Sequence, residues 1–390
     1  MKRKFCWGLG ALVVLVGIAT QVCRMLGRDS HLWTPSIIWQ TPQSEYGLQV
    51  AFTSTREMAV LSWRIDGKSD RQFVLRLVDL SGTVLRTFDL GAPGIYNMVG
   101  ASSPNSLIAM DFWRLGGKQA AVIMDVRSGT RVDIADHMFP PGAYGDSQPF
   151  SPSGKMAIVL PAPRGQGMPQ LVESASGRKI RDLKLPTWHG PLLRWKRDGT
   201  GILALDPATG RLITQGLEPP ERGGPLCFPR WKERAVLSPD ARRVAVFNTR
   251  RMGKLVVWVY DTATGKRTFA ATRRIPSNQR IENVQWSPRG DKLLVTLWQE
   301  NREDWGPAPE LCIINMLGKL QTMRLAGWRP IGLVEASSWS TDGRWLAVAL
   351  LPPSGDYRPV ALAVLDTKQK CKFRVTGDWR HHPTALPIRG

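Results

Sequence analysis

Residues that could catalyse a reaction or bind a metal are mostly far apart in this sequence of 390 residues. The serine-hydrolase motif Gly-x-Ser-x-Gly, the metalloprotease motif His-Glu-x-x-His and the glycine-rich phosphate loops are absent. No cysteines stand at the Cys-x-x-Cys spacing of zinc and redox sites, and whether any two of Cys227, Cys312 and Cys371 pair is left open. The histidines are His31, His137, His189, His381 and His382. We predict no catalytic residue, no metal site and no cofactor.

Arginine and tryptophan instead recur together in segments that we predict to be loops. Guanidinium groups bind carboxylates and phosphates, and aromatic rings stack on cations and on planar ligands. The chain carries 53 Lys and Arg against 32 Asp and Glu, a net charge of +21 that favours encounter with anionic partners. We predict that one loop-rich face binds such a partner through Trp113, Arg114, Arg164, Trp188, His189, Arg250, Arg251, Arg273, Arg274, Trp328 and Arg329.

A repeated turn followed by an apolar run predicts the elements that would position these loops. The turn has the form Ser-Pro-Asp-Gly, in which proline fixes φ and glycine tolerates positive φ. Its copies recur at intervals of 42 to 53 residues, which is typical of β-propeller blades. The clear copies begin at Phe150, Leu237, Trp286 and Trp339, and weaker ones at Phe52, Ala101 and Trp195. We predict an all-β, seven-bladed propeller of four-stranded antiparallel sheets, with the repeated tryptophans packed between blades.

A second turn pattern, Asp-x-x-Thr-Gly-Lys, follows a later strand in several units. It is clear at 261–266 and 206–211 and looser at 125–129. Asp bonds nearby backbone N–H groups and Gly takes positive φ, so this pattern predicts a hairpin between the last two strands of a blade. The unit at 193–217 is short, and we expect it to lack the long inner loop and perhaps one strand.

At these repeated turns and strands, the chain resembles the TolB-type, WD-like β-propeller repeat family. The resemblance spans roughly residues 50–378 and implies the propeller fold without implying an activity. The same repeat accompanies prolyl oligopeptidase-like enzymes, but their hydrolase domain of about 200 residues has no counterpart in this sequence. We expect residues 29–49 to form a tether, with a possible ring-closing strand, and residues 379–390 to form a C-terminal tail.

The N-terminal 28 residues have the pattern of a membrane signal-anchor. Lys2, Arg3 and Lys4 precede a run at 5–23 without a charge. Nineteen residues in a helix span about 28 Å, close to the hydrocarbon thickness of a bilayer. The preceding cations predict a cytoplasmic N-terminus and an exported propeller. Cleavage after the small residues Gly17 and Ala19 is the alternative, and it would give a secreted protein.

Export and the missing catalytic motifs together predict a non-catalytic binding or scaffold module. The part after residue 28 keeps 48 basic against 32 acidic residues, so its partner is expected to be a protein or an anionic envelope polymer or lipid surface. Nucleic acid is not expected outside the cytoplasm. The alternative is a hydrolase or lyase with a composite site at the channel mouth, which converging carboxylates or a histidine pair would indicate.

Overall fold

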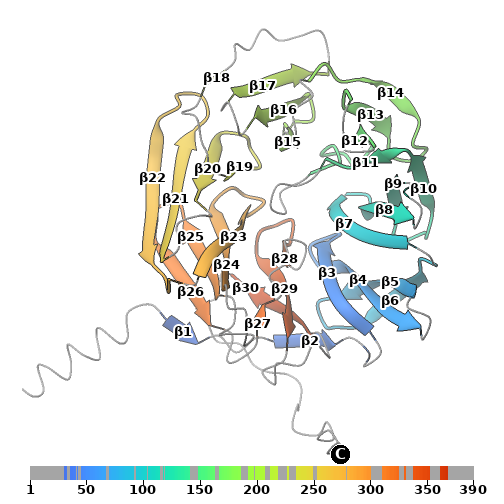
Figure 1. Ribbon diagram of the computed structural model, residues 1–390, viewed down its shortest axis with the longest axis horizontal. Coiled ribbons are helices and arrows are strands. Elements are labelled where there is room, and N and C mark those ends of the chain that lie inside the picture. The colour runs from blue at the N-terminus through green and yellow to red at the C-terminus, as the bar shows by residue number, and fades with distance from the viewer. Residues whose placement is uncertain are drawn as a thin grey trace, which may run out of the picture.

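Seven antiparallel sheets are arranged as blades around one axis (Figure 1). The computed structural model describes residues 30–32, 36–40, 42, 45–66, 70–91, 94–102, 104–114, 117, 119–140, 148–162, 167–185, 192–196, 198–206, 211–217, 226–227, 234–248, 253–277, 279–299, 310–324, 329–330, 337–351 and 361–367. The predicted seven-bladed, all-β architecture is confirmed. Among these residues no helix is long and apolar enough to span a membrane. The predicted anchor at 5–23 and the tail at 379–390 lie outside them.

The blades follow one another in chain order, and each runs from an innermost first strand to an outermost fourth strand. Blade 1 holds β3 (Glu45–Phe52), β4 (Glu57–Asp66), β5 (Asp70–Asp79) and β6 (Val84–Asp89). Blade 2 holds β7 (Gly94–Ser102), β8 (Leu107–Arg114), β9 (Gln119–Asp125) and β10 (Arg131–Ala135). Blade 3 holds β11 (His137–Met138), β12 (Met156–Pro161), β13 (Gln170–Glu173) and β14 (Lys179–Asp182).

The remaining blades follow the same scheme. Blade 4 holds β15 (Leu192–Trp195), β16 (Gly201–Asp206), β17 (Arg211–Gly216) and β18 (Leu226–Cys227). Blade 5 holds β19 (Arg234–Leu237), β20 (Arg243–Phe247), β21 (Lys254–Asp261) and β22 (Arg267–Arg274). Blade 6 holds β23 (Gln279–Trp286), β24 (Lys292–Gln299), β25 (Glu310–Asn315) and β26 (Leu320–Arg324). In blade 7, β27 (Arg329–Pro330) and β28 (Ser337–Trp339) both pair with β29 (Trp345–Leu351), which pairs with β30 (Ala361–Asp366).

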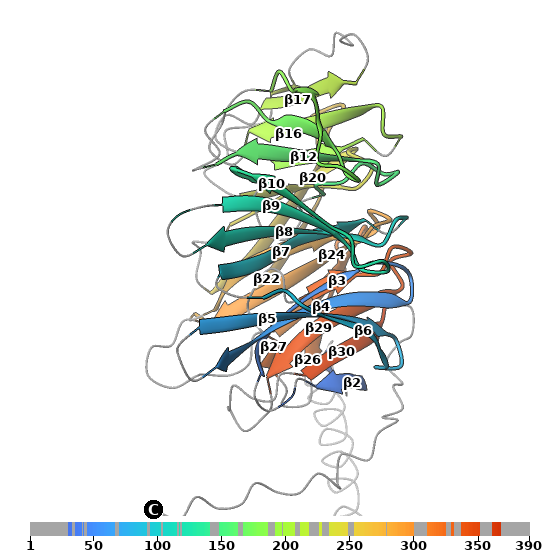
Figure 2. The ribbon, with the colours of Figure 1, turned by 90° about the vertical axis from the view of Figure 1, so that its right-hand side faces the viewer.

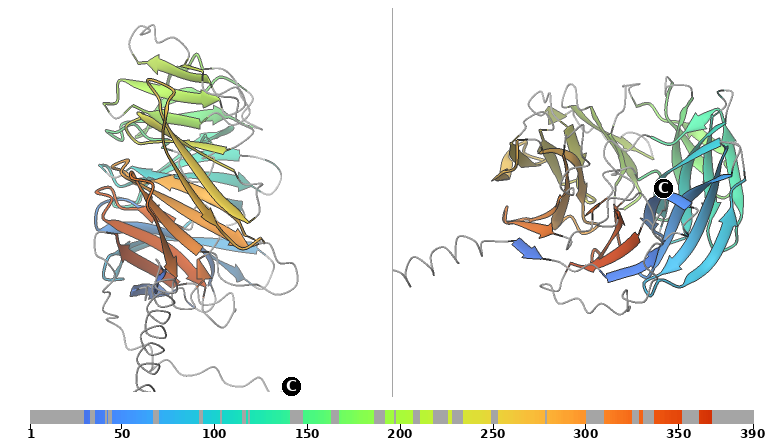
Figure 3. Two further views of the ribbon diagram at one scale, coloured as in Figure 1. Left: turned by 90° about the vertical axis from the view of Figure 1, so that its left-hand side faces the viewer. Right: turned by 60° about the horizontal axis from the view of Figure 1, so that its bottom comes forward.

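The N-terminal segment completes the outer rim of the last two blades. β2 (Ser36–Gln40) pairs antiparallel with β30 and supplies the outermost strand of blade 7. β1 (Ser30–Leu32) pairs in parallel with β26 and adds a fifth strand to blade 6. The right-hand view of Figure 3 shows both blue strands beside the orange and red strands of these blades. Blade 7 is therefore built from both ends of the described chain.

The repeated turns lie together at one end of the ring. Strands run across the thickness of the ring (Figure 2), so every connection between a first and a second strand lies on the same side. We call this side the turn face, and the opposite side, with the connections between second and third strands, the loop face. Turns of successive blades touch: Gly199 lies beside Pro152, Gly290 beside Pro239 and Gly343 beside Pro288. Such contacts join blade 3 to blade 4, blade 5 to blade 6 and blade 6 to blade 7.

The core consists of apolar clusters at the interfaces between neighbouring blades. The cluster between blades 5 and 6 is large and includes Trp286, whose Nε1 donates to the carbonyl oxygen of Val236 at 3.1 Å. Trp195 donates in the same way to Pro149 of blade 3 at 3.2 Å. The predicted inter-blade packing of these tryptophans is confirmed. The cluster between blades 4 and 5 is small, with Leu203 as the contribution of blade 4.

Blade 4 departs from the other blades in its connections. The segment 206–211, predicted to join the last two strands, instead connects the second and third strands, with Asp206 paired to Arg211. The prediction of its place was wrong because the same turn chemistry closes any hairpin, whichever strands flank it. The equivalent segments at 125–129 and 261–266 do join third and fourth strands. The long inner loop is missing as expected, and the fourth strand, β18, has two residues.

Candidate functional site

The structure describes only part of the predicted basic loop surface. Trp113 lies half-buried near the loop-face end of β8 in blade 2. Arg114 ends the same strand and Arg329 begins β27, and for both only the backbone is described. The other members of the predicted set outside the described residues are Arg164, Trp188, His189, Arg250, Arg251 and Trp328. Their convergence on one face stays a prediction.

Arg273 and Arg274 lie on a strand, whereas the sequence predicted a loop between blades. They end β22, the outermost strand of blade 5, where they pair with Leu255 and Lys254. Arg273 Nη1 donates to Thr322 Oγ1 of β26, so this side chain links the outer parts of blades 5 and 6. Outermost strands are solvent-exposed and polar, and their composition therefore resembles that of loops. This similarity explains the misassignment.

An aromatic cluster with two arginines lies between blades 1 and 2. Its ring centroids are 6.0 Å apart for Trp63 and Phe73, and 5.5 Å apart for Phe73 and Tyr96. The Arg71 guanidinium carbon lies 5.6 Å from the Trp63 ring, and that of Arg131 lies 5.5 Å from the Tyr96 ring. Tyr96 is only 4% exposed. The contact between Phe73 and Tyr96 joins the two blades, whereas each arginine contacts a ring of its own blade. Little of the Tyr96 ring is left for a ligand.

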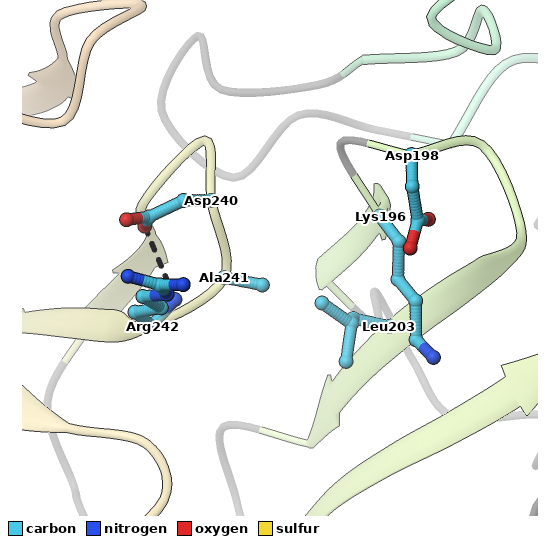
Figure 4. A pocket seen from close by; sticks show the side chains of 6 residues that line it. All are labelled: Lys196, Asp198, Leu203, Asp240, Ala241 and Arg242. Carbon is cyan, nitrogen blue, oxygen red and sulfur yellow. Dashed lines mark hydrogen bonds between the residues drawn. The ribbon is translucent and has the colours of Figure 1, made fainter.

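A pocket of about 490 Å³ opens on the turn face between blades 4 and 5. Figure 4 shows Lys196 and Asp198 on one side and the turn of blade 5 on the other. Its lining residues are Lys196, Asp198, Leu203, Asp240, Ala241 and Arg242. Leu203 is 5% exposed and gives the pocket an apolar wall.

The pocket lies where the contact between successive turns changes. In the sequence of blade 4, Lys196 and Arg197 stand where most repeats have serine and proline. Blade 5 has Ala241 where four other turns have glycine, and Ala241 adopts the same positive φ, 57°. The proline–glycine contact of the other junctions therefore has no equivalent residues here. Sequence reasoning noted the unusual blade 4 but not the opening that results from it.

The innermost strands also meet differently at this junction. Blade 5 has Leu237 where blades 4, 6 and 7 have tryptophan, so no indole reaches back from blade 5 to blade 4. Instead Arg194 of β15, only 3% exposed, donates from Nη1 to the carbonyl oxygen of Leu237 at 2.6 Å. A buried hydrogen bond thus replaces apolar packing beside the pocket.

Both pocket carboxylates are held by donors of their own turns. Backbone and side-chain hydrogen bonds from Thr200, at 2.9 and 2.7 Å, lower the pKa of Asp198. Asp240 accepts bonds from Ser238 Oγ at 2.6 Å and from the backbone N–H of Arg242 at 3.1 Å, the dashed line in Figure 4. Arg242 is exposed at the rim, and Lys196 is half-buried. The pocket therefore combines an apolar wall with two cations and two carboxylates.

Two further titratable groups in the described part of the chain, Asp111 and Cys312, are buried in the blades. Asp111 of β8 accepts the backbone N–H of Phe139 at 2.7 Å, and burial raises its pKa to about 7. Cys312 is a buried thiol outside any disulfide, and its Sγ lies 3.9 Å from Thr322 Oγ1. No three His, Cys, Asp or Glu side chains of the described residues are grouped so that they could hold a metal ion.

No protein-family model and no curated protein matches this chain. Among solved structures, it is similar to the β-propeller domain of Myceliophteria thermophila Cps50 (Swd1), with a TM-score of 0.53 and 14% identity over 84% of this chain and 99% of that one. A chain of the mitotic checkpoint complex has a TM-score of 0.47 and 14% identity, over 86% and 94% of the two chains. A chain of Kuenenia stuttgartiensis hydrazine synthase has a TM-score of 0.44 and 16% identity, over 68% and 85%. The similarity to the Cps50 domain shows the WD-like propeller fold and nothing of the function.

Proposed function

We propose that this chain is a membrane-tethered, extracytoplasmic β-propeller that serves as a non-catalytic scaffold for a protein partner. The repeated turns resemble those of TolB-type propellers and are in keeping with such a role. The N-terminal run at 5–23, with its preceding cations, supports the tether and the orientation. The pocket between blades 4 and 5 carries the proposal of a docking site.

The pocket favours a partner segment with an apolar side chain next to a carboxylate. Leu203 and Ala241 offer apolar surface, and Arg242 and Lys196 provide positive charge at the opening. The two pocket carboxylates already accept hydrogen bonds within their own turns, which reduces their attraction for a cationic partner. Loops carried on a rigid sheet scaffold commonly bind partners in this way.

A hydrolase or lyase, the alternative, gains no support from this pocket. Such a site needs one carboxyl group held protonated beside a second, ionised carboxylate. Asp198 and Asp240 are the carboxylates that share the pocket, and the bonds from Thr200 lower the pKa of Asp198. Asp198 is therefore unsuited to act as the general acid. This pair favours a binding site over an acid–base pair.

Partner capture with charge-reversal variants tests the scaffold proposal. The full-length chain, tagged after Gly390, is cross-linked in its own cells and recovered with its partners. Changing Lys196→Glu and Arg242→Glu should reduce recovery of a specific partner about ten-fold or more, because like charges then oppose the partner's carboxylate. Adding salt to wild-type extracts should weaken recovery in the same direction.

The matched control is Arg289→Glu, an exposed arginine in the turn of blade 6 on the same face. It changes the charge by as much as either pocket substitution made alone, but it lies away from the pocket, so recovery of the partner should persist. Equal loss with both variants would mean a non-specific charge effect. Undiminished recovery with the pocket variants would place the docking surface elsewhere.

A further inference from the structure

The pairing of the first described strand fixes where the N-terminal end of the described chain lies. β1 runs parallel to β26, with Ser30 opposite Thr322 and Leu32 opposite Arg324. β26 begins directly after the turn at 315–319, at the turn-face end of blade 6. Because the two strands are parallel, Ser30 stands at the end of β1 that is nearer to that turn. An antiparallel β1 would have placed Ser30 at the end nearer to the loop face.

That turn carries the most exposed large apolar side chain among the described residues. Leu317 is 90% exposed. Asn315 Oδ1 accepts the backbone N–H groups of Leu317 and Lys319 at 3.0 and 2.9 Å, and Gly318 adopts a φ of 73°. These bonds fix the turn while Leu317 projects into solvent. Exposing a leucine side chain to water costs free energy, so this position suits an apolar or interfacial environment.

Cations surround Leu317 on two blades. Lys319 follows it in the same turn and is exposed. Gly318 lies against Phe269 and Ala270 of β22, and that strand begins at the exposed Arg267, directly after the exposed Lys266. The nearby Asp261 accepts hydrogen bonds within its own turn from Ala263 and Thr264. An exposed apolar side chain among lysines and arginines is the pattern of contact with anionic lipid headgroups.

The length of the connecting segment places this rim close to a membrane. Only five residues lie between Ser30 and Arg24, the first residue after the apolar run. Fully extended, the chain from Arg24 to Ser30 spans roughly 20 Å. Leu317 precedes Thr322 by five residues, so it lies within roughly 20 Å of Ser30. Arg24 and Arg28 add positive charge to the same short segment.

We propose that the turn-face rim of blades 5 and 6, consisting of Leu317, Lys319, Lys266 and Arg267, rests on the anionic lipid surface beside the anchor. This rests on the proposed membrane tether. The contact would orient the ring so that blades 5 and 6 face the bilayer and blades 2 and 3, across the ring, face away from it. The rim then acts as a second, peripheral membrane contact in addition to the spanning segment.

Depth-sensitive fluorescence of the full-length chain in lipid nanodiscs tests this contact. A fluorophore is attached at L317C in a background with serine at Cys6, Cys23, Cys227 and Cys371, since Cys312 is buried. In discs that contain phosphatidylglycerol, its emission should shift to the blue, and lipids spin-labelled near the headgroup should quench it several-fold more than a fluorophore at I180C. Ile180 is the matched control, because it is an exposed apolar residue on the outermost strand of blade 3.

Charge reversal separates lipid contact from simple proximity. K319E combined with K266E should reduce the quenching at position 317 in phosphatidylglycerol discs and leave it unchanged in discs of phosphatidylcholine alone. Equal quenching at positions 317 and 180 in a chain that resists alkaline extraction would overturn the rim contact and leave the tether intact. Release of the whole chain by alkaline extraction would overturn the tether and the rim contact with it.

Discussion

Asp111 is a buried carboxyl group whose protonation is coupled to folding. It is 4% exposed, and burial raises its pKa in the folded protein to about 7 from an ordinary value of 3.8. The folded state therefore binds more protons than the unfolded state between these values, and stability falls as pH rises through about 7. Asp111→Asn keeps an acceptor for the Phe139 N–H and removes the charge. We expect the free energy of unfolding at pH 8 to rise by about 1–3 kcal/mol.

Denaturant unfolding at pH 5 and pH 8 checks this expectation. At pH 5 wild-type Asp111 is already protonated in the folded state, so the advantage of the variant should shrink. Asp182→Asn, on the exposed strand β14, is the control and should change stability by no more than about 0.5 kcal/mol at either pH. A variant that is less stable than the wild type at pH 8 would show that the Asp111 carboxylate has a stabilising partner.

Ala241 is a residue with a Cβ in a left-handed backbone conformation, as are Ser106 and Asp136 among the described residues. Its φ of 57° is a left-handed conformation, which costs a residue with a Cβ roughly 1–2 kcal/mol. Glycine at the same position loses more entropy on folding, by roughly 0.5–1 kcal/mol. We therefore expect Ala241→Gly to stabilise the protein by about 0.5–1 kcal/mol. Thermal unfolding of the two proteins measures the difference.

The reverse change at another blade provides the control for Ala241. Gly290 has a φ of 68°, and a Cβ there would meet its neighbours at ordinary contact distances. Gly290→Ala should thus destabilise by about 1 kcal/mol through backbone conformation alone. If both variants shift the melting temperature in the same direction, packing around the turns outweighs their backbone conformation.

Strands inside each blade were more predictable than strands at the rim. The apolar runs after the repeated turns became the buried second strands, because burial on both faces demands continuous apolar sequence. Outermost strands such as β6 and β22 are largely exposed, and their polar composition carries no such signal. Arg273 and Arg274 were assigned to a loop for this reason. β1 and β2, which add to distant blades, have no local pattern that reveals their partners.

At the scale of the whole ring, the blade number followed from the sequence, whereas the pocket did not. Seven copies of one turn at similar spacing specify seven blades with little ambiguity. The pocket depends on two turns, at 196–200 and 238–242, that face each other only after the ring has formed. The missing serine and proline of blade 4 open a pocket only because the turn of blade 5 lies next to that position. Predicting the pocket therefore requires knowing which turns are in contact.

A buried ion pair of blade 1 lies against β2, the closing strand of blade 7. Arg76 Nη1 donates to Glu45 Oε2 at 2.6 Å and to Ser62 Oγ at 2.9 Å. The Arg76 guanidinium carbon lies 5.4 Å from the ring of Trp39, on the closing strand β2. Burial raises the pKa of Glu45, but the bonds from Arg76 and Ser62 outweigh it and lower the pKa overall. The stabilisation is therefore present at neutral pH and is lost as pH falls below the ordinary value of 4.5.

Removing one member of this pair should open the ring at its closing junction. The side chains of Arg76 and Glu45 are 11% and 4% exposed, so Arg76→Ala leaves a buried carboxylate without its cation, at a cost of about 3–5 kcal/mol. Replacing both, with Glu45→Leu and Arg76→Met, removes both charges at similar volume and should recover most of that loss. A double-mutant cycle in denaturant measures the coupling, and the exposed pair Lys179 and Asp182 should give less than about 1 kcal/mol. Additive losses at Glu45 and Arg76 would mean that β2, through its backbone pairing with β30, closes the ring without help from the ion pair.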